Sequence, residues 1–118
     1  MSGSINSSGS VERFTLAAGE SKEFEVQKPG GCGWVIDVHG DESQSMVGVL
    51  NAVGTTVKLQ SAEGAAAYAD VGTVTVVPGG TQALTGQTGQ FAKIVNTGQG
   101  LAHVVAKPTF RVQPKVLL

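Results

Sequence analysis

The stretch FAKIVNTGQGLAHVVAKPTF, residues 91–110, decides the fold class of this chain. Apolar residues dominate 91–95 and 101–106, and a short turn with two glycines, residues 96–100, separates them. A strand, a glycine-containing turn and a second strand are typical of antiparallel β-structure. No residue in the stretch belongs to a pattern that indicates a reaction or a ligand. We therefore expect a β-protein whose function must be inferred largely from what the sequence lacks.

Short β-type segments separated by turn residues continue along most of the chain. Residues 22–26 alternate between polar and apolar, which predicts that Phe24 and Val26 face the core. Residues 34–38 are almost continuously apolar, which predicts a strand in the middle of a sheet. The other predicted strands are 11–16, 46–53 and 56–60 (a hairpin), 66–70, 73–77, and edge strands at 81–84 and 109–113, with a turn at 85–90.

Eight to ten short strands with no helix predict an all-β fold, an antiparallel β-sandwich. A jelly roll has eight strands in two sheets, so we expect a jelly-roll-like sandwich, with an immunoglobulin-like sandwich as the alternative. The 118 residues suffice for one domain. We interpret residues 1–10 as a flexible N-terminal arm or a cloning remnant, 11–106 as the β-sandwich, and 107–118 as an extended C-terminal arm.

The composition is poor in charge and rich in glycine. Charged residues make up 14% of the chain, and there are 17 glycines; an average soluble domain has about 25% charged residues. This composition suits a compact protein with tight turns, or one whose surface is covered by copies of itself or by a partner. The net charge of −1 predicts no nucleic-acid partner. No apolar run approaches the ~20 residues of a membrane span, so we expect no membrane partner.

Charge is unevenly placed along the chain. Residues 1–45 carry seven acidic and three basic residues, a balance of −4, and residues 46–118 carry two acidic and five basic residues, a balance of +3. An acidic front and a basic tail could attract one another between copies in an assembly. A random split is the alternative interpretation.

The two histidines of the chain, His39 and His103, are candidate metal ligands. His39 lies in the segment DVHGDES, residues 37–43, where carboxylates and an imidazole could bind a divalent ion. A polar turn made by Gly40 and Asp41 is the simpler interpretation. His103 lies in an apolar strand and is expected to face outward or to be hydrogen bonded. We therefore predict no metal site.

Catalytic patterns are absent from the sequence. Cys32, the single cysteine, lies among glycines and is interpreted as a small buried filler rather than a nucleophile. There is no nucleophile elbow and no phosphate-binding loop. We predict that the protein is not an enzyme and uses no cofactor.

The aromatic residues offer little for binding sugars. Trp34 begins the most apolar strand, and Phe14, Phe24 and Phe91 also fit core positions. Tyr68 is ambiguous. A carbohydrate-binding module that uses Trp34 or Tyr68 as a platform is one alternative function.

The two ends of the chain suggest an assembly role. An extended arm can add a strand to the edge of a neighbour's sheet or cross an interface. The tail could equally pack on its own domain as a last strand. The candidate contact residues are Phe110, Arg111, Val112, Val116, Leu117 and Leu118 in the tail, with Glu20, Glu23 and Glu25 as acidic partners.

The segment VERFTLAAGESKEFEV, residues 11–26, together with the later stretch 91–110 resembles small virion proteins of tailed bacteriophages. Parts of these segments, LAAGESKEFEV (16–26) and IVNTG (94–98), also occur in immunoglobulin-like bacterial domains, but there the Asn-x-Gly hairpin usually comes before the Gly-Glu-Ser strand, the reverse of the order here. The resemblance implies a capsid decoration (cement) protein, a homo-oligomer (dimer or trimer) that binds a major capsid protein on the virion surface after synthesis in the host cytoplasm. A tail-fibre or receptor-binding module that uses loops such as 39–45 is the alternative.

Overall fold

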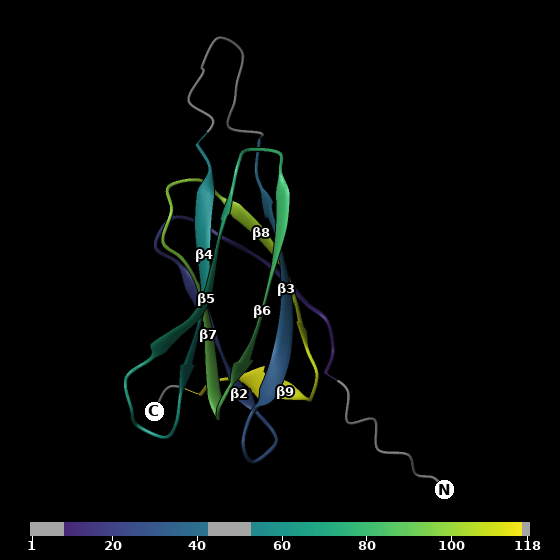
Figure 1. The fold of residues 1–118 in the computed structure, drawn as a ribbon, viewed down its shortest axis with the longest axis vertical. Coiled ribbons are helices and arrows are strands. Elements are labelled where there is room, and N and C mark those ends of the chain that lie inside the picture. Colours follow the sequence, from purple (N-terminus) through teal and green to yellow (C-terminus); the bar gives the residue numbers. More distant parts are fainter. Residues whose placement is uncertain (1–8, 43–52, 117–118) are drawn as a thin grey trace, which may run out of the picture.

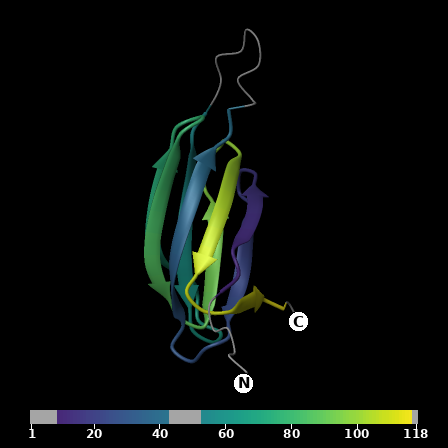
Figure 2. The same ribbon diagram turned by 90° about the vertical axis from the view of Figure 1, so that its right-hand side faces the viewer.

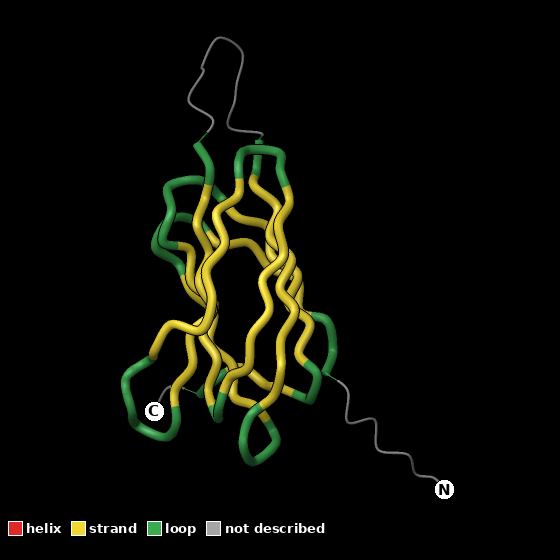
Figure 3. Tube along the Cα trace, viewed as in Figure 1, coloured by secondary structure: helices red, strands yellow, loops and turns green. Residues whose placement is uncertain are grey.

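The computed structural model describes residues 9–42 and 53–116, and these form nine β-strands in two antiparallel sheets (Figures 1 and 3). One sheet has the order β1-β8-β3-β6, and the other has the order β5-β4-β7-β2-β9. The strands are β1 (Glu12–Leu16), β2 (Ser21–Val26), β3 (Cys32–Gly40), β4 (Thr55–Ala62), β5 (Ala69–Val76), β6 (Thr81–Thr88), β7 (Phe91–Asn96), β8 (Ala102–Pro108) and β9 (Val112–Pro114).

The strand pairing is that of a jelly roll. β1 pairs with β8, β2 with β7, β3 with β6 and β4 with β5, and successive pairs alternate between the two sheets. Such nested pairs arise when one long antiparallel ribbon is rolled up, so that its two halves supply neighbouring strands. Figure 2 shows the four-stranded sheet with β3 and β8 in its middle. The predicted all-β, jelly-roll-like sandwich is confirmed.

Six of the predicted strands match strands of the structure, with ends shifted by a few residues. They are 11–16, 22–26, 34–38, 56–60, 91–95 and 101–106, which correspond to β1, β2, β3, β4, β7 and β8. The predicted strand 46–53 lies outside the described residues, apart from Val53, which is not in a strand. The second strand of the predicted hairpin, 56–60, is part of β4.

Between residues 66 and 90 the edge strand predicted at 81–84 is confirmed as the first half of β6, but two other predictions were wrong. The two predicted strands 66–70 and 73–77 are one strand, β5, and the predicted turn 85–90 continues the strand β6 as far as Thr88. Gly86 explains the error at the predicted turn. A Cβ added to this residue would lie 2.5 Å from the Val71 side chain, so the glycine is required by close packing within a strand. This glycine lets β5 and β6 approach closely and does not mark a turn.

The stretch 91–110 is a crossover between sheets and not a hairpin. β7 pairs with β4 and β2, whereas β8 pairs with β1 and β3 in the other sheet. The turn 96–100 therefore carries the chain from one layer of the sandwich to the other. Strand-turn-strand patterning predicted the strands correctly, but it does not distinguish these two connections.

The core lies between the two sheets, and alternate residues of each strand supply it. Phe24 and Val26 face inward as predicted, and the Trp34 side chain is only 2% exposed. Phe14 packs against the core from its margin. The core assignment of Phe91 was wrong, because Ala92 and the alternate residues after it take the inward positions of β7.

The buried side chain of Asn96 joins segments that are distant in the sequence. Its amide nitrogen donates hydrogen bonds to the carbonyl oxygens of Leu16 (2.9 Å) and Gly100 (2.7 Å). Its amide oxygen accepts hydrogen bonds from the Thr55 hydroxyl (2.6 Å) and the backbone N–H of Gly98 (2.8 Å). An amide group has two donor hydrogens and two acceptor lone pairs, so every one of them is satisfied.

Replacing Asn96 by Ala should lower the free energy of unfolding by about 2–4 kcal/mol, because buried backbone and hydroxyl groups lose their partner. Denaturant unfolding measures the change. Gln99→Ala is the matched control, since this side chain lies in the same turn and is exposed, and it should shift stability by no more than about 0.5 kcal/mol. Equal stability of the two variants would contradict the role given to the Asn96 network.

Candidate interaction surfaces

The outer face of the five-stranded sheet carries a cluster of aromatic and charged side chains, here called the Tyr68 cluster. The Tyr68 hydroxyl donates a hydrogen bond to Glu23 Oε1 (2.8 Å), and Lys115 Nζ lies 3.5 Å from the same oxygen. Lys93 and Lys115 each lie 5.4 Å from the centre of the Tyr68 ring. Lys115 also lies 4.6 Å from the centre of the Phe91 ring, within the range of a cation–π interaction.

Strand register explains why these side chains meet. Glu23 of β2 is paired with Lys93 of β7, and Glu25 of β2 is paired with Phe91. Outward residues of paired strands lie directly opposite each other, so opposite charges on them attract. The predicted outward orientation of Glu23 and Glu25 is confirmed by the burial of Phe24 between them.

The tail completes this sheet within the same chain, as in the alternative to an extended arm stated above, and β9 corresponds to the edge strand expected at 109–113. Residues 107–108 belong to β8, and β9 pairs with β2 through Val112, Gln113 and Pro114. Without β9, the edge of β2 that faces away from β7 would be unpaired, and β9 pairs with this edge. The attraction expected between the acidic front and the basic tail of different copies thus occurs inside one chain, between Glu23 and Lys115.

The candidate contact residues of the tail fall into two groups. Phe110 and Val112 pack against the core as partly buried side chains. Arg111 is exposed, and Val116 is 65% exposed. Leu117 and Leu118 lie outside the described residues, as do residues 1–8 of the predicted N-terminal arm.

Glu20 has a local role at the turn between β1 and β2. Its Oε1 accepts a hydrogen bond from the backbone N–H of Ala17 at 2.8 Å. Glu20 thus stabilises its own turn. Among the described residues of the tail, Lys115 is contacted by Glu23 and Gln113 by Glu25.

A pair of histidines lies on the outer face of the four-stranded sheet. His39 and His103 are register partners on β3 and β8, with ring centres 6.0 Å apart. His39 Nδ1 lies 2.9 Å from the Thr81 hydroxyl, and His103 Nε2 lies 2.8 Å from Asp41 Oδ1. His103 is hydrogen bonded, as predicted. Within residues 9–42 and 53–116, no group of three or more His, Cys, Asp or Glu side chains is arranged to hold a metal ion.

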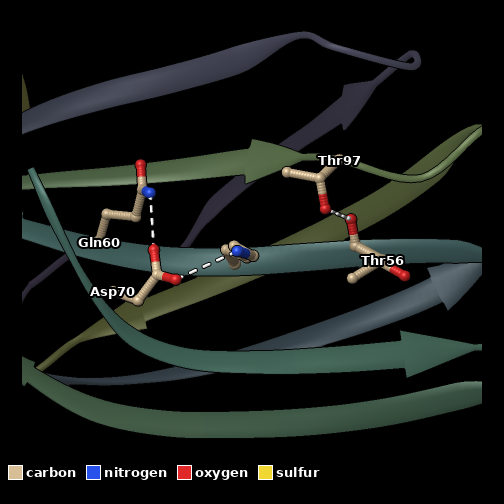
Figure 4. A network of polar contacts seen from close by, with 5 residues as sticks. Thr56, Gln60, Asp70 and Thr97 are labelled. Carbon is tan, nitrogen blue, oxygen red and sulfur yellow. Dashed lines mark hydrogen bonds and ion pairs between the residues drawn. The ribbon is translucent and has the colours of Figure 1, made fainter.

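A polar network, which the sequence did not indicate, joins β4 and β5. Asp70 accepts hydrogen bonds from Gln60 (2.8 Å) and Lys58 (3.1 Å), and Figure 4 shows Gln60 and Asp70 turned toward each other. These hydrogen bonds, first from Gln60 and then from Lys58, lower the pKa of Asp70. In the same figure Thr97 points to the backbone of Thr56, which links the end of β7 to β4.

The two aromatic residues that could bind a sugar, Trp34 and Tyr68, make contacts within the protein. The Trp34 indole N–H donates a hydrogen bond to the buried Thr88 hydroxyl (2.8 Å), so the ring is a core group. The Tyr68 ring is approached by two lysines, as described above. Cys32 is buried, as predicted for a small filler.

One open hollow of about 380 Å³ lies between three turns at one end of the sandwich, lined by residues 26–30 with Glu63 and Gln90. Its polar groups already bind the backbone. Glu63 Oε2 accepts from the N–H of Gln90, and Gln90 Oε1 accepts from the N–H of Gly64, both at 3.0 Å. None of the described residues forms a helix long and apolar enough to cross a membrane.

The similarity to the crystal structure of PirA supports the fold. No protein-family model matches the chain, and no curated protein matches its sequence. The crystal structure of PirA is similar over 83% of this chain and 92% of its own, with a TM-score of 0.54 and 12% identity. The naturally occurring empty particle of cowpea mosaic virus, its top component, aligns over 100% of this chain and 95% of its own, with a TM-score of 0.43 and 12% identity.

Tyr68, the only tyrosine of the chain, should ionise well above its ordinary pKa of 10.0. Burial, the hydrogen bond to Glu23 and the negative charge of Glu23 all raise its pKa. Because the pKa is raised in the folded state, the associated stability should be present below pH 10 and lost as the pH rises above it. Phenolate absorbance during an alkaline titration measures this pKa.

Glu23→Gln should lower that pKa toward the ordinary value, because the negative charge beside the phenol is removed. Glu25→Gln is the matched control, since Glu25 is the next outward residue of β2. A titration midpoint at the ordinary value in the unmodified protein would contradict the described contact.

Proposed function

We propose that this chain is a non-enzymatic structural protein of a virion, a capsid decoration protein that stabilises the shell through repeated protein–protein contacts. The observation that carries the proposal is the nested pairing of the eight strands from β1 to β8, in which β1 pairs with β8, β2 with β7, β3 with β6 and β4 with β5. This jelly-roll architecture is found in viral capsid domains among others. The resemblance of residues 11–26 and 91–110 to phage virion proteins supports the specific role in decoration.

The chemistry of the described surface supports a contact function. Outward charged groups bind one another, as in Lys58–Asp70 (3.1 Å), Lys107–Asp37 (2.7 Å) and Lys115–Glu23 (3.5 Å). These pairs neutralise much of the charge that the outer faces of the sandwich would otherwise present. A block with a weakly charged surface suits binding in many symmetric copies, where repetition raises the overall avidity.

The end of the tail is the part of the candidate contact set that remains open to a partner. Arg111 and Val116 are exposed on either side of β9, whereas Phe110 and Val112 are held by the core. We assign the contact with a major capsid protein to Arg111, Val116 and the residues after it. Glu23 contacts Lys115 and Glu25 contacts Gln113, so both help to hold β9 against β2.

Mass spectrometry of gradient-purified virions tests the proposal. The virions are those of the phage whose genome carries the coding sequence. The protein should be present in many copies per particle and should be released before the major capsid protein on mild denaturation. Its absence from purified virions would overturn the proposal.

Removal of residues 116–118 should leave the fold intact and weaken binding to capsid shells, because β9 and its pairing with β2 are retained. Co-sedimentation with isolated shells measures binding, and thermal unfolding measures stability. Deletion of residues 109–118 is the contrasting variant, which should also lose stability because it removes the partly buried Phe110 and Val112. Unchanged shell binding by the shorter truncation would contradict the role of the tail.

A further inference from the structure

We propose that the free edge of β6 is the surface through which two copies of this chain associate. The inference deepens the proposed function and rests on it for the choice of a second copy as the partner. It concerns the contact between copies, which is separate from the contact that the tail makes with the shell.

The sequence around this edge contains no charge. Residues 71–92 form a run of 22 residues without Asp, Glu, Lys, Arg or His. The run includes nearly all of β5, the turn at 77–80 and the whole of β6. These two strands lie at the same side of the sandwich, each at the end of its own sheet (Figure 1).

β6 is a regular strand with an open edge. Its eight residues pair in unbroken register with β3, and Pro78 lies outside it in the preceding turn. On its other side, no backbone hydrogen bond to another described residue is present. Such an edge offers a row of unpaired N–H and C=O groups to another strand.

The other free edges in the described part of the chain carry features that discourage pairing. β1 is five residues long and bears Glu12 and Arg13. β9 has only three residues, ends at Pro114 and is followed by Lys115. β5 carries Asp70, and its register with β4 is interrupted by a bulge. Charge, proline, short length and bulges are the usual protections of an edge strand, and β6 has none of them.

The open part of the edge is the beginning of β6. Thr81, Gln82 and Ala83 are exposed in succession, whereas later residues alternate between exposed and buried. Farther along, β5 lies close to β6, since a Cβ at Gly72 would be 3.5 Å from the Thr85 carbonyl oxygen. The contact is therefore centred on residues 81–83.

Self-pairing fits the chemistry of this segment. A two-fold axis places a strand antiparallel to its own copy, so each side chain lies opposite itself or a near neighbour. Like charges in such a position repel, whereas Thr and Gln can hydrogen bond across the pair. The four-stranded sheet would then continue across the axis into the sheet of the second copy.

Sedimentation velocity on the full chain tests the inference. The unmodified protein should form a dimer at micromolar concentration, and Ala83→Lys should raise the dimer dissociation constant about fivefold or more, because the two added lysines then lie close to each other across the two-fold axis. Thr15→Lys is the matched control, since it adds the same charge to β1, the opposite edge of the same sheet. The control should retain the dimer, and thermal unfolding should show that both variants are folded.

Mixing Ala83→Lys with Ala83→Glu should restore a dimer that neither variant forms alone at the same concentration. A monomeric unmodified protein, an unchanged mass for Ala83→Lys, or no dimer in the mixture would overturn the inference. The outcome is separable from the proposed function. A dimer that is absent from virions overturns only the function, and a monomer that is present in virions overturns only the β6 contact.

Discussion

The hydrogen bonds of the Asn96 side chain are the constraint on which the arrangement of this sandwich depends. They tie the end of β1, the start of β4 and the turn after β7 at the point where the chain crosses between sheets. The backbone of Asn96 adds bonds to the turn between β1 and β2, through Gly19 and Glu20. An apolar side chain at this position would leave buried polar groups unpaired, so the site admits one arrangement of these segments and disfavours slipped ones. The crossover is thus specified by hydrogen bonding as well as by burial.

The sequence predicts the fold class well because its strands alternate strongly. Phe24, Val26 and the strand that contains Trp34 were placed correctly, since burial on one face of a sheet leaves a period of two. The role of Asn96 could not be predicted in this way. Asn-Thr-Gly is a common turn signal, and the partners of the side chain lie at residues 16 and 55, far away along the chain. Gly86 was misread for a related reason, because a glycine that permits close packing looks the same in sequence as one that permits a turn.

The candidate contact residues show both the strength and the limit of charge patterning. The separation of acidic and basic residues along the chain suggested an attraction between the front and the tail of different copies, and the structure shows one such ion pair within a single chain. It could not indicate whether the two parts meet within one chain or between copies, because that depends on whether β2 has an open edge. The structure closes this edge with β9, and Lys115 then lies beside Glu23. The exposed residues Arg111 and Val116 of the tail and the edge of β6 are the surfaces that we propose for partners.

The claim that copies meet edge to edge at β6 is tested most directly by cross-linking. Ala83→Cys adds one thiol at the exposed start of β6, and the native Cys32 is buried and should not react. A short bismaleimide reagent, added at micromolar protein, should then convert most of the chain to a covalent dimer, while Thr15→Cys on β1 should remain monomeric. Equal cross-linking of the two variants, or none for Ala83→Cys, would contradict the account.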